Sequence, residues 1–340
     1  MLEFYPWSKK LLEEAYNNYC KSQKFPILDI ELGGACNFNC LYCDTPKYGC
    51  GIKYSIEDLE PFLCDPQIKM IFICGLGEPT FGPNESKLLK VLELCKKHSV
   101  KCSMFTNLSF INDKIYSYID LGVLYPIFKL DSFDINKIKK IYNTSDELAT
   151  TQLNNISNIV KHVNVVNGYT NIAASIVPSS LNICEIKPLI KWCKDNDIFP
   201  LIGQLEDAGK GHDVFTSLNV DESMLLELKQ YIYDCYGESY SIPICPSVLF
   251  GIHIDFEGDI IVDKTSGLSC QWFWLSEPQS VKICNFVEND IDDISRCIVN
   301  YRKSKYNVVK QIYKEHNELI FGGCGGDIKN LLKFYIEKML

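Results

Sequence analysis

The 340-residue chain is 46% hydrophobic and 23% charged, a composition typical of one large or two modest globular domains. Its formal net charge of −9 disfavours a nucleic-acid or anionic-membrane partner, and its apolar runs are shorter than the about 18 residues that span a membrane. Seventeen cysteines are too few for a disulfide scaffold of this length. The first ten residues contain no basic stretch followed by an apolar one, so we expect a cytoplasmic protein whose cysteines are thiols, some of them metal ligands.

From residue 26 to about residue 206, short apolar runs alternate with longer amphipathic ones. Six strands are predicted at residues 27–32, 70–74, 101–106, 125–130, 171–177 and 199–205. Helices are predicted between them at residues 55–63, 85–98, 113–121, 146–162 and 181–196. This alternation indicates a parallel sheet built through right-handed crossovers, with its chemistry at the carboxyl ends of the strands.

The pattern changes after residue 206. Residues 207–212 are predicted to be a linker or lid, residues 221–236 a helix, and residues 249–256 and 259–262 a hairpin with a Glu-Gly turn. Two further helices are predicted at residues 291–301 and 327–340. We therefore expect three parts: an N-terminal helical extension at residues 1–25, a barrel at residues 26–212 and a small α+β domain at residues 213–340.

Three cysteines follow the first predicted strand with the spacing C-x3-C-x2-C: Cys36, Cys40 and Cys43. Three thiolates on one loop can hold three irons of a cubane iron–sulfur cluster and leave the fourth iron without a protein ligand. A structural zinc site would need a fourth ligand close by, and the nearest additional thiol is Cys50. Packed thiols without a metal are the remaining alternative. The spacing and the position on a loop favour the cluster.

In these cysteines, and in Tyr42 just before the last of them, the chain resembles the radical S-adenosylmethionine (SAM) superfamily. The resemblance spans residues 26–206 and implies an α/β fold, a partial (β/α)6 TIM-like barrel. It also implies a [4Fe-4S] cluster on Cys36, Cys40 and Cys43 that binds the amino and carboxylate groups of SAM at its open iron. Tyr42 would lie near the adenine. A small electron donor such as a flavodoxin or ferredoxin would be a partner.

The second predicted strand ends in the sequence GLGEP, which is similar to the superfamily's Gly-Gly-Glu-Pro motif with a leucine between the glycines. Gly75 and Gly77 would let SAM approach the backbone, and Glu78 is expected to help hold the SAM ammonium group. Such a turn is a weak signal alone, but here it follows the cysteine loop by one strand–helix unit. Thr106 and Asn107 similarly resemble the Thr-Asn pair after the superfamily's third strand.

Later strand ends place further polar side chains at the same rim. Lys129 or Asp131, together with Ser175, is expected by similarity to hold the carboxylate and ribose of SAM. Lys129 is the strong cation candidate, because the arginines of the chain lie far away at residues 296 and 302. Lys129, Asp131 and Glu206 are also candidates for a catalytic acid or base. The alternative for each is a solvated residue at a strand end.

The cysteines after residue 240 resemble the auxiliary-cluster extensions of the superfamily called SPASM and twitch domains. The resemblance implies a second iron–sulfur cluster. The match is imperfect, because the fifth position after the turn glycine of the hairpin is Asp263 and not a cysteine. The number of thiols suits one auxiliary cluster with the ligands Cys245, Cys270, Cys324 and either Cys284 or Asp263.

These features predict an oxygen-sensitive radical SAM enzyme that abstracts hydrogen from a substrate C–H bond, in peptide (RiPP-type) or natural-product maturation. A radical dehydrogenase or epimerase acting on a sugar or polyol is one alternative. A non-catalytic iron–sulfur electron carrier and a zinc-binding protein are the others. A hydrolase is disfavoured, because the five histidines form no recognisable zinc or triad spacing.

Overall fold

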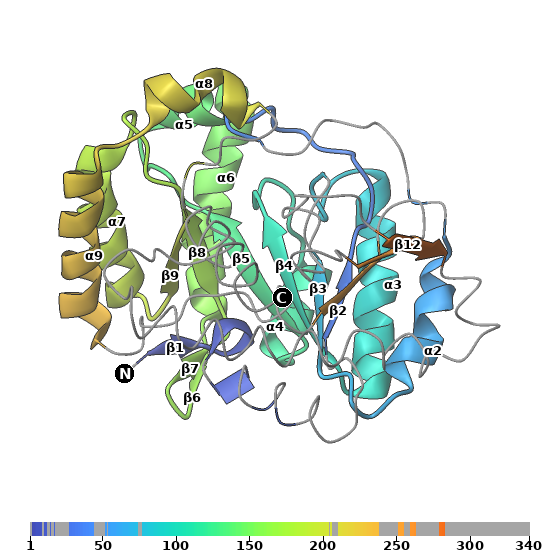
Figure 1. The fold of residues 1–340 in the computed structure, drawn as a ribbon. Helices are drawn as coiled ribbons and strands as arrows, with labels where there is room; N and C mark the ends of the chain where they lie inside the picture. Colours follow the sequence, from blue (N-terminus) through green and yellow to red (C-terminus); the bar gives the residue numbers. More distant parts are fainter. Residues whose placement is uncertain are drawn as a thin grey trace, which may run out of the picture.

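The computed structural model describes residues 2–8, 27–43, 54–73, 77–203 and 210–237, single residues at 10, 11, 14, 17, 52 and 205, and the backbone of three strands at 251–254, 259–262 and 279–282. Six parallel strands form its centre, with helices on their outer side (Figure 1). This arrangement confirms the predicted α/β fold with a parallel sheet. In spatial order the strands are β2 (Ile27–Ile30), β3 (Met70–Ile73), β4 (Lys101–Thr106), β5 (Leu124–Lys129), β8 (Ala173–Ile176) and β9 (Phe199–Ile202).

The helices predicted between the strands are present with small shifts at their ends, and those predicted at residues 291–301 and 327–340 lie outside the described residues. The first is a 3-10 turn, η2 (Ile56–Leu59), that continues into α2 (Glu60–Leu63), and Ser55 caps it through a capping box. The others are α3 (Pro83–His98), α4 (Asp113–Asp120), α6 (Asp146–Ile159), the 3-10 turn η3 (Val160–His162) and α7 (Ile183–Asp195). Within the part of the chain that the structure describes, two helices were not predicted, α5 (Ile135–Tyr142) and α8 (Gly211–Leu218).

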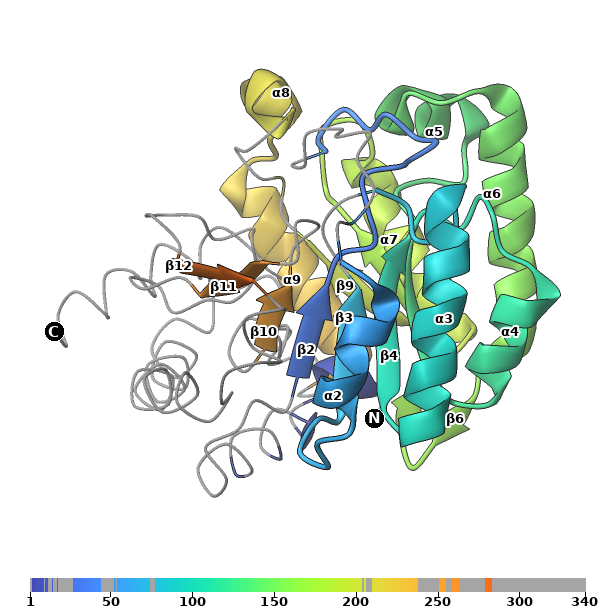
Figure 2. The ribbon, with the colours of Figure 1, turned by 90° about the vertical axis from the view of Figure 1, so that its right-hand side faces the viewer.

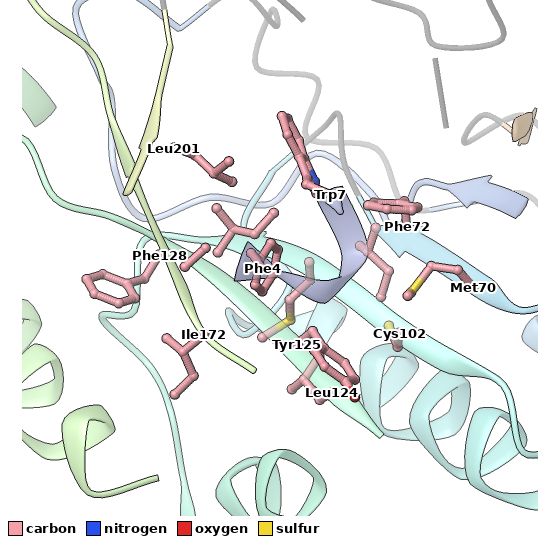
Figure 3. Close-up of a cluster of buried hydrophobic side chains, with 14 of the residues drawn as sticks. Phe4, Trp7, Met70, Phe72, Cys102, Leu124, Tyr125, Phe128, Ile172 and Leu201 are labelled. Carbon is pink, nitrogen blue, oxygen red and sulfur yellow. The ribbon is translucent and has the colours of Figure 1, made fainter. Parts of the chain in front are cut away.

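The N-terminal segment closes the amino end of the barrel. Strand β1 (Glu3–Phe4) pairs with β7 (Tyr169–Thr170), which pairs with β6 (Val165–Val166), and the turn η1 (Tyr5–Trp7) follows β1. Phe4 and Trp7 are buried in the hydrophobic core (Figure 3). Their ring centroids lie 6.5 Å from that of Tyr125 and 6.3 Å from that of Phe105 respectively. Figure 1 shows this small sheet at the end opposite to α5 and α8. The carboxyl ends of the central strands therefore lie at the other end of the sheet, on the side of α5 and α8.

The sheet continues beyond the six central strands (Figure 2). The predicted hairpin is present as β10 (Gly251–Ile254) and β11 (Asp259–Val262), and β12 (Gln279–Lys282) pairs with β11. β10 also pairs in parallel with β2, so the sheet reaches nine strands. Helix α9 (Glu222–Tyr236) lies beside α7, and its buried side chains belong to the barrel core. Among the described helices, none is long and apolar enough to cross a membrane.

Candidate functional site

The cysteine loop leaves β2 at the carboxyl edge of the sheet and is supported from outside by α5. The Asn39 amide donates to the Tyr142 carbonyl at 3.0 Å, and the Leu41 amide donates to the Ile141 carbonyl at 2.9 Å. The buried ring of Phe38 stacks on the Tyr142 ring, with a centroid distance of 5.4 Å. The end of α5 therefore fixes the loop on both sides of Cys40.

The three thiols of the loop are largely shielded from solvent. Cys40 is buried, and Cys36 and Cys43 are half-buried. Burial raises the pKa of the Cys36 thiol to about 11 and also raises that of Cys40. The neighbouring thiols add to these rises, Cys40 to the pKa of Cys36 and Cys43 to the pKa of Cys40.

This donor set fits three corners of an iron–sulfur cubane. Within the described ranges, no three His, Cys, Asp or Glu side chains converge to hold a single metal ion. A cubane does not require such convergence, because each thiolate binds a different iron. A bound cationic metal deprotonates a ligating thiol, which would overcome the raised pKa values of Cys36 and Cys40.

The side chain of Lys129, at the end of β5, points at the cysteine loop. Its Nζ lies 3.8 Å from the Cys40 Sγ, 5.4 Å from the centroid of the Tyr42 ring and 5.8 Å from that of the Tyr142 ring. The ammonium charge lowers the pKa of Cys40, against the larger effect of burial. Ser175 on β8 is the register partner of Lys129 and is half-buried at the same level of the sheet.

Asp131 anchors the aromatic residue of the cysteine loop. Its carboxylate accepts a hydrogen bond from the Tyr42 hydroxyl and another from the Val177 amide at 2.7 Å. The Asp131 amide donates to the Tyr142 hydroxyl at 3.1 Å. Asp131 is only 2% exposed, and burial raises its pKa while these donors oppose the rise. This geometry suits a residue that fixes Tyr42, and it leaves little access for a substrate proton.

Gly77 and Glu78 connect the end of β3 to the cysteine loop. Gly77 has φ +76°, and a Cβ built on it would lie 2.3 Å from the Gly33 carbonyl oxygen and 2.6 Å from that of Ala35. The Glu78 amide donates to the Ala35 carbonyl at 2.8 Å. Asn84, at the start of α3, places its Nδ2 3.0–3.1 Å from the carbonyl oxygens of Gly33, Ala35 and Glu78. The two loops therefore pack backbone to backbone, as only a glycine at position 77 allows.

The Glu78 carboxylate binds the ends of β3 and β4 together. It accepts hydrogen bonds from the Thr80 amide and hydroxyl, the Thr106 hydroxyl at 2.6 Å and the Asn107 amide at 2.6 Å. The side chain is 2% exposed, and burial raises its pKa against the effect of these donors. Asn107 in turn donates to the Asn37 side chain at 2.9 Å, within the cysteine loop. Thr106 and Asn107, predicted as part of the site, are thus joined to the cysteine loop through Glu78 and Asn37.

Lys210, the residue before α8, contacts the cysteine loop. The Lys210 amide donates to the Cys43 carbonyl at 2.9 Å, and its ammonium group donates to the Asn39 side chain. At the other end of α8, the Ser180 amide donates to the Leu218 carbonyl at 2.9 Å. Lys210, within the predicted linker or lid at residues 207–212, therefore contacts the cysteine loop, and the last two residues of that segment begin α8.

Several predicted site residues lie outside the described residues. They are Gly75, Glu206, Asp263, Cys245, Cys270, Cys284 and Cys324. Four residues of the site were not predicted: Asn37, Asn84, Tyr142 and Lys210. Of these four, Asn37 could have been found from the sequence, because it lies between the first two cysteines of the motif.

Residues 30–175 match the family model of the Radical SAM superfamily. The match covers less than half of the chain. The cysteine loop, the GLGEP turn and the ends of β4 and β5 fall within the matched segment, and β8 ends at its limit.

Among curated proteins, the chain is 30% identical over 142 residues to the uncharacterised protein MJ0804 of Methanocaldococcus jannaschii, covering 40% of this chain and 44% of that protein. It is 26% identical over 198 residues to the bacteriochlorophyllide d C-8(2)-methyltransferase of Chlorobaculum tepidum, covering 50% and 40%. The matches thus span less than half the length of these relatives.

Solved structures share the fold. SuiB of Streptococcus suis bound to S-adenosylmethionine has a TM-score of 0.58 and 16% identity, covering 80% of this chain and 65% of that one. The enzyme anSMEcpe with bound AdoMet and the Cp18Cys peptide has a TM-score of 0.54 and 14% identity, covering 81% and 80%. At these identities the likeness shows the architecture alone.

Proposed function

We propose that the chain is a radical SAM enzyme whose cluster is held by Cys36, Cys40 and Cys43. The observation that carries the proposal is the three-thiol loop at the carboxyl edge of β2, inside the segment that matches the Radical SAM family. A [4Fe-4S] cluster on this loop would deliver one electron to SAM and so generate a 5′-deoxyadenosyl radical that abstracts hydrogen from the substrate.

The residues of this chain hold the loop and the rim at which SAM would bind. Asp131 fixes the Tyr42 hydroxyl, which sets the position of the aromatic ring beside the adenine site. Glu78 fixes the ends of β3 and β4 through internal donors, so its role is to position the backbone around Gly77. The backbone of residues 75–77, the rim at Thr106 and Asn107, and Ser175 are the proposed contacts of SAM.

A peptide is the proposed substrate. Support comes from proteins that share the fold: SuiB has been solved with the precursor peptide SuiA, and anSMEcpe with the Cp18Cys peptide. The proposal includes an auxiliary cluster in residues 213–340, on Cys245, Cys270 and Cys324 with Cys284 or Asp263, and a flavodoxin or ferredoxin as electron donor in the cytoplasm. The proposed reaction on this peptide is an oxidation.

Radical-dependent methylation is a second candidate, favoured by one observation. The Chlorobaculum tepidum relative is a methyltransferase, and its alignment covers 50% of this chain, a larger share than the 146 residues of the family match. Mass spectrometry of the product separates the two, because methylation adds a methyl group and oxidation removes hydrogen.

The proposed activity is tested by anaerobic reconstitution with iron and sulfide, followed by chromatography for 5′-deoxyadenosine after SAM and dithionite are added. We expect iron, sulfide and 5′-deoxyadenosine together. Iron without SAM cleavage would identify an electron carrier, and zinc in place of iron would identify a structural metal site. Either result would reject the proposal.

A further inference from the structure

Lys129 is held in a defined position at the end of β5. Its carbonyl accepts a hydrogen bond from the Gln152 Nε2 at 3.3 Å, and the next amide, of Leu130, donates to the Ser175 carbonyl at 2.9 Å. Both contacts fix the backbone from which the side chain leaves the sheet. The position from which the side chain leaves the sheet is therefore set by the fold.

The side chain of Lys129 is oriented toward the cysteine loop by three neighbours. The Cys40 Sγ is 3.8 Å from its Nζ, and the faces of Tyr42 and Tyr142 lie within 6 Å of the ammonium group, a distance at which an aromatic ring attracts a cation. Tyr42 is held by Asp131, and Tyr142 stacks on Phe38. The ammonium thus lies against a metal-binding thiol with its aromatic surroundings already fixed.

We propose that Lys129 donates a hydrogen bond to the Cys40 thiolate and thereby raises the reduction potential of the cluster. This inference rests on the proposed function in one respect, that the loop binds a cluster. A reduced cluster carries one more negative charge than the oxidised cluster, so a fixed cation beside its ligand stabilises the reduced form. Hydrogen bonds to ligand sulfurs and nearby charge are known determinants of cluster potentials.

The competing role for Lys129 is the one predicted from the sequence, binding of the SAM carboxylate. The two roles differ in a quantity that can be measured without SAM. A cation that acts through Cys40 changes the potential of the cluster whether or not SAM is present. A cation that acts only on the SAM carboxylate changes SAM affinity and leaves the potential of the SAM-free cluster unaltered.

The test compares Lys129→Met and Lys129→Arg with the native chain and with Lys187→Met. Lys187 is the matched control, because it is a surface lysine on α7 paired with Glu227. Each protein is reconstituted anaerobically, its iron and sulfide are counted, and the cluster is titrated without SAM while electron paramagnetic resonance follows the reduced form. SAM affinity is then measured by equilibrium binding.

For Lys129→Met we expect the ratio of reduced to oxidised cluster at a fixed potential to fall by about tenfold, which is a shift of about 59 mV for a one-electron couple. Lys129→Arg, which keeps the charge, should recover most of the shift, and Lys187→Met should show none. An unchanged potential in Lys129→Met, with or without weaker SAM binding, would overturn the inference and leave the proposed function standing. Loss of iron from both Lys129 variants would also overturn it, since Lys129 would then be needed for binding. Absence of a cluster from the native chain would instead refute the proposed function.

Discussion

Replacing Gly77 with alanine tests the contact between the GLGEP turn and the cysteine loop. An added Cβ would lie 2.3 Å from the Gly33 carbonyl oxygen and 2.6 Å from the Ala35 carbonyl oxygen, distances that require the backbone to move. Gly77 also has φ +76°, a left-handed conformation that costs a residue with a Cβ about 1–2 kcal/mol. Overpacking of this kind costs about 1–3 kcal/mol more. We therefore expect Gly77→Ala to lower the free energy of unfolding by about 2–5 kcal/mol.

Gly122→Ala is the matched control for this substitution. Gly122 follows α4, has φ +66°, and has nothing within 4 Å of the position that an added Cβ would take, so its substitution carries only the backbone cost of about 1–2 kcal/mol. Urea unfolding of both variants without metal gives the difference due to the contact alone. Because Gly33 and Ala35 directly precede Cys36, Gly77→Ala should also bind less iron than Gly122→Ala. Equal stability and equal iron content in the two variants would refute this reasoning.

Three further predictions concern the thiols and the buried carboxylate. Cys40→Ala should abolish SAM cleavage. Cys193→Ala, which removes a core thiol of α7, should keep both iron binding and SAM cleavage. SAM cleavage by Cys40→Ala would contradict the assignment of Cys40 as a cluster ligand. Glu78→Gln places an amide NH2 among hydrogen-bond donors that now face a carboxylate. Urea unfolding should therefore show a free energy of unfolding lower by about 1–3 kcal/mol. A change below about 0.5 kcal/mol would be inconsistent with the four contacts. Without metal, Cys36 is mostly protonated below its pKa of about 11. Its rate of alkylation by iodoacetamide, measured by peptide mapping, should therefore rise about tenfold per pH unit from pH 8 to 10. A rate that does not change with pH would contradict the raised pKa.

The strands and most helices were predictable because each carries a local pattern. All six central strands are short apolar runs, and α4 and α6 start at Asn112 and Ser145, whose side chains cap the first turn. α5 was missed, although Asp134 caps it and Ile138, Ile141 and Tyr142 share its buried face. A helix of eight residues gives a weak periodic signal. The sequence therefore did not predict that α5 supports the cysteine loop.

The site was predictable in its ligands and less so in its connections. The cysteine spacing identified the loop, because a fixed local spacing is what the cluster requires. The contacts of Asn84 with Gly33 and of Lys210 with Asn39 join residues 51 and 171 positions apart, and no local pattern encodes such pairs. Lys129 was predicted from its charge at a strand end, but its nearest sulfur, Cys40, became apparent only in three dimensions.

The proposed function requires that the cysteine loop holds a cluster that cleaves SAM. The most direct measurement is the yield of 5′-deoxyadenosine from SAM and dithionite by the anaerobically reconstituted native chain, with Cys40→Ala treated identically. We expect dithionite-dependent 5′-deoxyadenosine from the native chain and none from Cys40→Ala. A fully iron-loaded native chain that forms no 5′-deoxyadenosine, or equal formation by the variant, would contradict it.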